Sequence, residues 1–159
     1  WLLQKKAQKG KKEEMKSTMV VLQITEKQIR WGHIGDSRLY YFHKDRMVSR
    51  TLDHSVPQML ALGGQIKERE NRVLRVLGTP WEGEAYSLAD PIEKTGDQAF
   101  ILCSDGFWEL ITEKEMEKTL KQSYSVAQWL EKMEKIVQKH GEGKDMDNYS
   151  AICVYIDSK

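Results

Sequence analysis

The sequence contains little cysteine, and this limits how the fold can be held together. Only two cysteines occur in 159 residues, Cys103 and Cys153, and both fall inside apolar runs typical of strands. Small secreted domains that depend on disulfides use many more. Two buried thiols in a reducing compartment are the simpler interpretation, and a disulfide between neighbouring strands is the alternative. Neither cysteine has a close Cys or His companion in the sequence, which argues against a thiolate metal site.

Long hydrophobic runs and excess charge are also missing. No apolar stretch approaches the roughly 20 residues that a membrane-spanning helix needs, and no signal-peptide pattern occurs. The formal net charge is +1, so no whole-molecule field favours nucleic acid or an anionic membrane. The phosphate-loop and G-x-S-x-G nucleophile patterns do not occur either. We therefore expect a cytoplasmic globular protein with neither nucleic acid nor membrane as a partner.

The remaining composition predicts one domain. Hydrophobic residues make up 40% and charged residues 31% of the chain, an ordinary balance for a globular protein. A chain of 159 residues can bury a real core but leaves no room for two domains. Residues 1–16 are rich in lysine and predict a solvated, basic helical lead-in. A basic nucleic-acid arm is the alternative, which we disfavour because no aromatic residues are interleaved with the lysines. The chain opens at Trp1 rather than at a methionine, which we interpret as the sign of a chain cut from something longer.

The first half of the chain alternates apolar, often β-branched runs with short polar turns. Strands are predicted over 18–24, 29–34, 38–43, 47–48, 73–78 and 86–88. The first four form an antiparallel meander in this interpretation. A helix is predicted over 56–62 and a charged surface loop over 65–72.

The second half predicts two helices between two buried strands. An apolar run ends at Cys103, and the last strand is expected over 149–156. Capping-box spacing occurs at 112–115 and again at 125–128, and Gly141 is expected to end the second helix. Strands followed by helices and a final strand predict an α+β fold.

One stretch, 100–110, stands out chemically. Asp105 follows a buried apolar run, where a carboxylate is costly to desolvate unless a positive group meets it. Gly106 then allows a sharp backbone turn. Asp36 and Asp147 occupy similar turns next to other strands. Three carboxylates at strand ends, far apart in sequence, predict one acidic pocket for a hard divalent cation.

Each carboxylate also has a plain structural interpretation. Asp105 fits an ordinary Asp-Gly turn, and Asp36 fits a tight hairpin whose Arg38 makes a weak surface ion pair. Asp147 belongs to a common Asp-Asn turn, and Asp145 competes with it, although Asp145 lies further from the last strand.

The segment 53–55 reads Asp-His-Ser and has two interpretations. One is a helix N-cap by Asp53 or Ser55 beside a histidine. The other is a hydrolase triad, which we disfavour because sequence neighbours cannot make the triad's geometry unaided.

Six motifs occur in a recognisable order between Ser17 and Ile156. They are Ser17-Thr18, Gly35-Asp36-Ser37-Arg38, Leu52-Asp53-His54-Ser55, Arg72-Val73-Leu74-Arg75-Val76-Leu77-Gly78, Ser104-Asp105-Gly106-Phe107-Trp108 and Asp147-Asn148. In this order they resemble the PPM-type phosphatases, the protein phosphatase 2C-like, metal-dependent serine/threonine phosphatases. The compact Val-Leu-Gly segment looks like the bacterial branch. The resemblance implies an antiparallel β-sandwich flanked by helices (α-β-β-α), here incomplete at the N-terminus.

The resemblance also implies a chemistry. Two manganese or magnesium ions would activate a water that attacks the phosphorus of phosphoserine or phosphothreonine in a protein. Asp105 and Asp147 would be ligands of one catalytic metal, and Asp36 with Asp105 would serve an additional, weaker site. The segment 62–72 corresponds to the mobile flap beside the family's active site. A serine/threonine kinase and the chain's own missing N-terminal segment are further expected partners.

Two elements of the family pattern do not occur in the chain. One is an Arg that holds the substrate phosphate, and the other is an Asp-Gly-x-Gly-Gly segment whose Asp bridges the metals. Lys16 and Glu109 also depart from the family's usual Gly and Asp. We therefore expect the C-terminal portion of a phosphatase domain, catalytic only when the missing segment is supplied. The alternatives are a non-catalytic binding module that recruits a phosphoprotein or a kinase, and an oligomerising piece with an open sheet edge.

Overall fold

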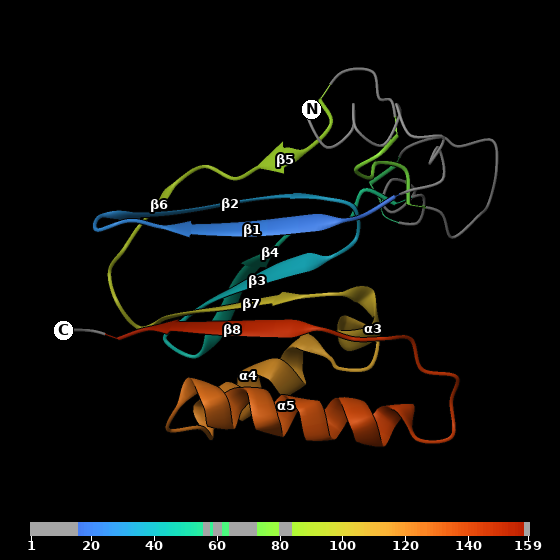
Figure 1. The fold of residues 1–159 in the computed structure, drawn as a ribbon. Coiled ribbons are helices and arrows are strands. Elements are labelled where there is room, and N and C mark those ends of the chain that lie inside the picture. The colour runs from blue at the N-terminus through green and yellow to red at the C-terminus, as the bar shows by residue number, and fades with distance from the viewer. Residues whose placement is uncertain (1–15, 56–57, 59–61, 64–72, 80–83, 158–159) are drawn as a thin grey trace. The chain divides into compact units, whose positions relative to one another are not determined.

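The computed structural model describes residues 16–55, 58, 62–63, 73–79 and 84–157 (Figure 1). Most of the predicted lead-in, of the helix over 56–62 and of the flap over 62–72 therefore lies outside the described residues. The chain divides into two compact units, each described here by itself. The first comprises Trp1–Ile24, Ile29–Ser37 and Leu52–Ile92, and the second comprises Thr25–Gln28, Arg38–Thr51 and Glu93–Lys159. The single domain inferred from chain length stays a prediction.

The first unit is built on a small antiparallel sheet. Its strands are β1 (Met19–Ile24), β2 (Gln28–Ile34), β5 (Ser87–Leu88) and β6 (Ile92–Glu93). β2 pairs with the other three, and β1 and β2 form a hairpin in which Met19 lies opposite Ile34 and Ile24 opposite Ile29. Ile29 and Ile34, at the two ends of β2, are buried. They are five positions apart on a regular strand, so their side chains point to opposite faces of the sheet.

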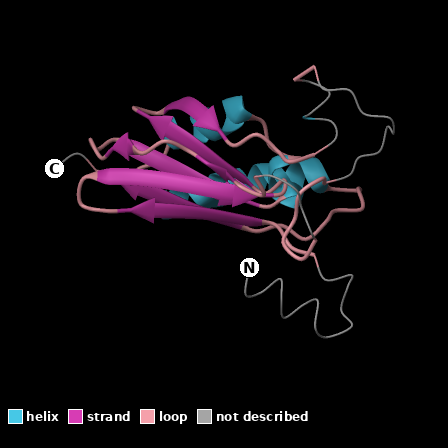
Figure 2. Ribbon diagram, turned by 90° about the horizontal axis from the view of Figure 1, so that it is seen from above, coloured by secondary structure: helices cyan, strands magenta, loops and turns pink. Residues whose placement is uncertain are grey.

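The second unit contains a four-stranded sheet in the order β4-β3-β7-β8, with every pair antiparallel. The strands are β3 (Arg38–His43), β4 (Arg46–Arg50), β7 (Gln98–Cys103) and β8 (Ala151–Ile156). Loops join the strands at their ends (Figure 2). The helices are α3 (Asp105–Trp108), α4 (Glu113–Lys121) and α5 (Val126–Gly141), and α4 and α5 lie along one face of this sheet (Figure 1).

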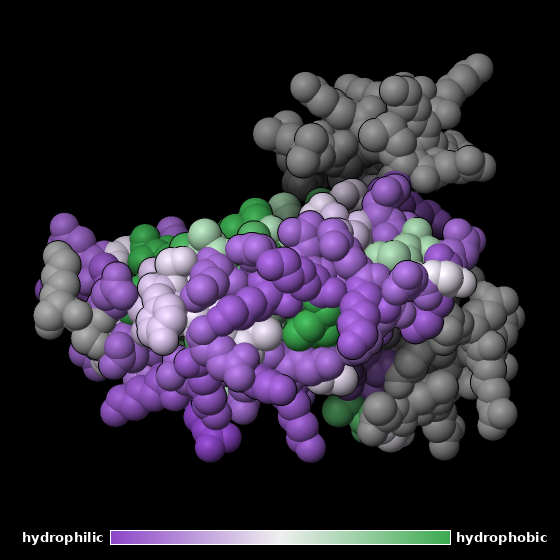
Figure 3. All heavy atoms as spheres, turned by 90° about the horizontal axis from the view of Figure 1, so that it is seen from below, coloured by the Kyte–Doolittle hydropathy of each residue, from purple (hydrophilic) through white to green (hydrophobic). Residues whose placement is uncertain are grey.

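The core of the second unit lies between this sheet and its helices. Trp129 of α5 is fully buried, meets the ring of Phe42 edge-on at 5.5 Å, and donates its Nε1–H to the Met116 carbonyl. The other buried members of this core are Tyr40, Ala99, Ile101, Cys103, Phe107, Ile111, Met116, Leu120, Met133 and Val137. The outward surface of α4 and α5 is mostly hydrophilic (Figure 3). A buried apolar side and a hydrophilic outer side make α5 the amphipathic helix that the spacing of its apolar residues predicts.

Both cysteines are free thiols in the structure, as the simpler interpretation of the sequence holds. Ile101 lies opposite Cys153, and Cys103 lies opposite Ala151, so the two thiols occupy neighbouring strands without being paired residues. Burial raises the pKa of each thiol to about 12, which keeps both protonated and weakly reactive at neutral pH.

The two capping boxes predicted from the sequence are confirmed in part. Thr112 and Glu115 form the predicted capping box, in which each side chain accepts the other residue's backbone N–H. The second box is only half formed. Ser125 accepts from the Gln128 N–H, but the Gln128 side chain accepts the N–H of Tyr124 instead of that of Ser125.

The predicted meander is wrong. β1 and β2 belong to one sheet and β3 and β4 to the other, so Gly35-Asp36-Ser37 connects two sheets and is not a hairpin turn. Segment 73–78 is also not a strand. It makes two isolated bridges instead, at Val73 with Ser55 and at Leu77 with Ser17. Alternating apolar residues indicate extended backbone, but they do not say which strand supplies the hydrogen bonds.

The described elements comprise antiparallel sheets and helices, which confirms the predicted α+β class. Within the residues that the structure describes, no helix has the length and apolar character needed to cross a membrane.

We expect Phe42→Ala to lower the free energy of unfolding by about 3–5 kcal/mol, because it leaves a cavity beneath Trp129. Phe42 is 0% exposed, whereas Val48 of the neighbouring β4 is 57% exposed. Val48→Ala should therefore stay within about 1 kcal/mol of the parent protein. Chemical denaturation followed by circular dichroism checks both. Equal losses in the two variants would contradict this description of the core.

Candidate metal centre

Asp105 lies where β7 ends and α3 begins. The end of β7 is tied to the last loop by two hydrogen bonds, in which the Ser104 N–H donates to the Ser150 carbonyl and the Ser150 N–H donates to Ser104 Oγ, each at 3.0 Å. Asp105 is the first residue of α3 and accepts the Gly106 N–H on its Oδ1 at 2.9 Å. The residue before Asp105 is thus tied to the loop that precedes β8.

Gly106 allows the last loop to come directly against this turn. A Cβ at Gly106 would lie 2.7 Å from the Asn148 carbonyl oxygen and 3.1 Å from that of Asp147. Real side chains do not tolerate such distances to backbone atoms, so only glycine fits. The structure therefore brings the Asp105 turn and the Asp147 turn together, although 42 residues separate them (147 − 105).

Asp147 is exposed, and its Oδ1 accepts the Asn148 N–H at 2.7 Å. Asp145, the competing carboxylate, is exposed in the same loop. An ionised carboxylate accepts more bonds than the one recorded for Asp105 or for Asp147, and two such groups on adjoining turns are hard oxygen donors of the kind that Mg²⁺ and Mn²⁺ prefer. The carboxylate oxygens are suitable ligands for a divalent cation, and the close contact of the two turns at Gly106 brings the two residues to the same end of the sheet.

Arg38 supports this end of the sheet from the next strand. Its guanidinium carbon lies 3.3 Å from the centre of the Trp108 ring, and its Nη1 donates to the Tyr40 hydroxyl at 3.1 Å. Burial raises the pKa of Tyr40 to about 12, so the hydroxyl stays neutral. The stacking on Trp108 is a role that the sequence did not indicate, because it joins residues 70 positions apart (108 − 38).

Asp36 lies in the first unit, in a turn that is fixed on both sides. Gly35 has φ = 104°, a conformation that side chains rarely adopt, and a Cβ there would lie 2.3 Å from Thr18 Cγ2. Beyond Asp36, the hydroxyls of Ser37 and Thr18 share a hydrogen bond of 2.7 Å. The Ser-Thr motif before β1 therefore packs against the Gly-Asp-Ser motif after β2.

His54 holds the same turn from a third direction. The Gly35 N–H donates to His54 Nδ1 at 3.3 Å, and the His54 N–H donates to the Gly35 carbonyl at 2.9 Å. Because Nδ1 accepts, the neutral ring carries its proton on Nε2 and donates it to Ser87 Oγ at 2.8 Å. In the same segment, Ser55 Oγ accepts the Gln58 N–H at 3.5 Å, which agrees with the helix N-cap interpretation at Ser55. The His54 contacts do not support the hydrolase triad.

A second histidine stacks on the first. The rings of His33 and His54 lie 4.5 Å apart with 20° between their planes, and His33 Nε2 donates to the Leu52 carbonyl at 2.8 Å. Burial, with the neighbouring His33, lowers the pKa of His54 to about 4, and burial also lowers the pKa of His33. Both rings are therefore neutral at pH 7.

The segment 73–78 completes this cluster. The Leu74 N–H donates to the His54 carbonyl at 2.6 Å, and Ser17 and Leu77 exchange two backbone hydrogen bonds of 3.1 and 2.8 Å. Four of the motifs recognised in the sequence thus meet around the Asp36 turn. The four motifs are joined to one another by backbone and side-chain hydrogen bonds.

The described residues contain no group of three His, Cys, Asp or Glu side chains that would by itself hold a metal ion. Asp105 and Asp147 belong to the second unit and Asp36 to the first. The shared site of Asp36 and Asp105 therefore stays a prediction.

Comparison with known proteins shows to which family the chain belongs. The serine/threonine phosphatase stp of Listeria innocua is 31% identical over 147 residues, covering 88% of this chain and 56% of the relative. The chain belongs to the PPM-type family of bacterial serine/threonine phosphatases. No family model matches it. The chain spans about half the length of the curated relatives it matches.

Solved structures of PPM-type phosphatases agree on the fold. Stp1 from Staphylococcus aureus aligns with a TM-score of 0.80 at 23% identity, covering 99% of this chain and 63% of that one. The catalytic domain of PstP, solved in complex with two manganese ions, aligns with a TM-score of 0.75 at 21% identity, covering 98% and 66%. These similarities confirm the protein phosphatase 2C-like fold predicted from the motif order.

Gly106→Ala should lower the free energy of unfolding by about 1–3 kcal/mol, because the new methyl group must push away the backbone of the Asp147 loop. Glu109→Ala is the matched control, since Glu109 is exposed just after the same short helix. It should change stability by less than about 0.5 kcal/mol. Urea denaturation of both variants gives the comparison. A Gly106→Ala protein as stable as the parent would show that the two turns are not in tight contact.

His54→Gln should change how stability depends on pH. The folded pKa of His54 is about 4 against an ordinary 6.5, so the neutral ring contributes stability above pH 6.5 that is lost as the pH falls toward 4. At pH 7.5 the variant should be about 1 kcal/mol less stable, having lost a hydrogen bond to the Gly35 turn. This deficit should shrink between pH 6.5 and 4.

Thermal unfolding midpoints across that pH range provide the measurement. Val48→Ala, which removes no titratable group, is the control and should follow the parent's pH profile. A deficit of the His54 variant that does not change with pH would rule out the titration.

Proposed function

We propose that this chain forms the C-terminal part of a metal-dependent protein serine/threonine phosphatase, and that it hydrolyses phosphoserine and phosphothreonine in proteins by means of a metal-activated water. The observation that carries this proposal is the meeting of the Asp105 and Asp147 turns across Gly106. Membership of a family of phosphatases supports the reaction class, and the manganese ions in the PstP structure support the cofactor.

In the proposed site, Asp105 and Asp147 would hold one catalytic Mn²⁺ or Mg²⁺, and Asp36 would be a ligand of an additional ion. When bound, two such ions lower the pKa of a water and neutralise charge on the phosphoryl oxygens. The chain's own part is to fix the carboxylates. Gly106 sets the approach of the two turns, and Ser104 locks the end of β7 to the last loop.

The Asp36 turn is supported in a comparable way. Thr18 and His54 hold the residues on either side of Asp36 through side-chain hydrogen bonds. Neutral supports suit a site for a cation, because a protonated histidine next to Gly35 would repel a divalent ion. The low pKa of His54 therefore serves the proposed metal site.

Turnover in this proposal needs a polypeptide that carries the family's Arg and its Asp-Gly-x-Gly-Gly segment, because neither occurs in the 159 residues. The first would hold the substrate phosphate, and the Asp of the second would bridge the metals. The chain then acts in cytoplasmic signalling, opposite a serine/threonine kinase. The alternative function is a pseudophosphatase that binds a phosphoprotein or a kinase without hydrolysis, and it is favoured by the same two missing motifs.

Phosphate release from a phosphothreonine peptide with Mn²⁺ tests the proposal. We expect little turnover by the chain alone and Mn²⁺-dependent hydrolysis once a polypeptide carrying both missing motifs is added. Asp105→Asn should then reduce the rate more than about 100-fold, since even residues outside the ligand set often cost 10- to 100-fold. Asp145→Asn is the matched control and should stay within about threefold of the parent.

The possible outcomes separate the two candidate functions. Hydrolysis that survives both chelation and Asp105→Asn would exclude the mechanism, and robust turnover by the chain alone would exclude the need for a second segment. Phosphopeptide binding without hydrolysis in the supplemented protein would favour the pseudophosphatase.

A further inference from the structure

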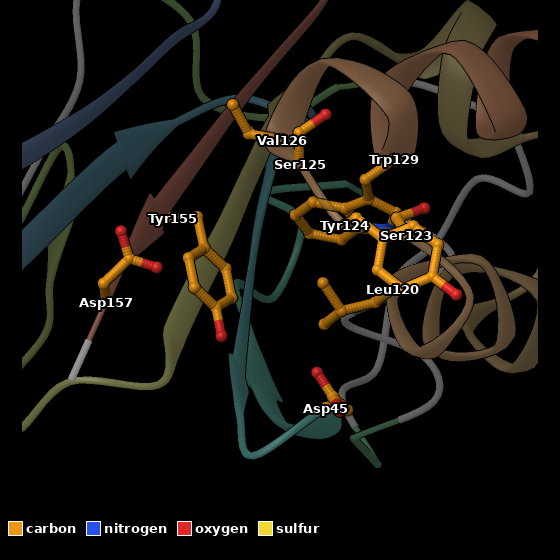
Figure 4. A pocket seen from close by; sticks show the side chains of 9 residues that line it. All are labelled: Asp45, Leu120, Ser123, Tyr124, Ser125, Val126, Trp129, Tyr155 and Asp157. Carbon is orange, nitrogen blue, oxygen red and sulfur yellow. The ribbon is translucent and has the colours of Figure 1, made fainter.

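A second concave site lies in the second unit, at the end of the sheet away from Asp105. The pocket has a volume of about 460 Å³ and is lined by Asp45, Leu120, Ser123, Tyr124, Ser125, Val126, Trp129, Tyr155 and Asp157 (Figure 4). β7 runs from Gln98, near this pocket, to Cys103, next to the Asp105 turn. A strand of six residues spans roughly 17–20 Å, so the pocket is separate from the candidate metal centre.

The charged groups at this pocket are carboxylates. Asp45 lies in the turn between β3 and β4, and Asp157 follows β8 directly. Figure 4 shows the ring of Tyr155 between these two side chains. Asp97 adds a third negative charge that acts on the same tyrosine. None of the nine described residues that line the pocket is basic.

The rest of the wall is aromatic and apolar. Trp129 and Leu120 are buried and form its inner part, and Tyr124 is 98% exposed at the rim. Two local hydrogen bonds hold the loop that carries Tyr124: the Tyr124 N–H donates to the Gln128 side chain, and Ser123 Oγ donates to the Thr119 carbonyl. A tyrosine that is 98% exposed has its ring available to contact a ligand.

We propose that this pocket binds a basic segment of a partner protein, with an arginine or lysine side chain between Asp45 and Asp157 and its stem against Tyr155 and Tyr124. Carboxylates on both sides neutralise the cation, the tyrosine rings offer cation–π contacts, and the apolar wall accepts the methylene groups. The charge of the lining selects this occupant, because an acidic or phosphorylated segment would be repelled. The pocket contains none of the proposed metal ligands and does not depend on phosphatase activity.

Binding of a short peptide tests the proposal directly. The probe is fluorescein-labelled Ala-Arg-Arg-Leu-Arg-Ala-Gly, which contains no phosphorylatable residue, and its match is the same peptide with citrulline in place of each arginine. The full chain is titrated in EDTA, so that metal binding contributes nothing, and anisotropy is read at two salt concentrations. We expect saturable binding of the arginine peptide, about fivefold or more tighter than that of the citrulline peptide, and weaker at higher salt.

Matched variants locate the site. Asp45→Asn with Asp157→Asn should weaken binding about fivefold or more, and Tyr124→Ala should weaken it by a similar factor. Asn tolerates the backbone of Asp45, where φ is 58°, so the double variant should fold. Asp90→Asn, an exposed carboxylate in the first unit, is the control and should bind like the parent.

Circular dichroism confirms that each variant is folded. Equal binding of the arginine and citrulline peptides, or unchanged affinity in both pocket variants, overturns the proposal. So does the absence of saturable binding below about 1 mM peptide. None of these results bears on metal-dependent hydrolysis, which is measured separately.

Discussion

The close approach of Gly106 to the carbonyl oxygens of Asp147 and Asn148 is the constraint on which the candidate metal centre depends. It depends on the register of β7 and β8, in which Cys103 lies opposite Ala151, so that β7 ends where β8 begins. Buried apolar side chains fix that register, since a slip of one residue would replace Ala99, Ile101 and Cys103 in the core with the side chains of the other face of β7. The position of the two carboxylates is therefore a consequence of how the core packs.

Much of this could be predicted from the sequence. Asp105 was identified because an apolar run that stops at Ser-Asp-Gly can hardly be anything other than a buried strand ending in a turn. The limits of β3 and the cap at Thr112 followed from local signals. Which strands share a sheet could not be predicted from local signals. A short polar stretch such as Gly35-Asp36-Ser37 looks the same whether it closes a hairpin or crosses to another sheet, because the difference lies in partners distant in sequence.

The support of the Asp36 turn was missed for the same reason. Thr18, His54 and Ser87 are ordinary residues in their local sequence, and only the fold places them around Gly35. The one local signal was Gly35 itself, because a glycine before an Asp in a tight connection often has a positive φ. The stacking of His33 on His54 also has no sequence signature. Burial lowers the pKa of His54, and burial cannot be read from the residues next to it in the sequence.

The two ends of the sheet in the second unit would contribute differently to a phosphatase. Ligands at the Asp105 end act on the group that reacts, so their contribution is largest in the transition state. A basic segment held at the Tyr155 end touches no reacting atom and is bound equally in the ground state and in the transition state. Such uniform binding lowers KM and leaves kcat unchanged. If both sites act on one substrate, the pocket selects which protein is bound, and the carboxylates determine how fast it reacts.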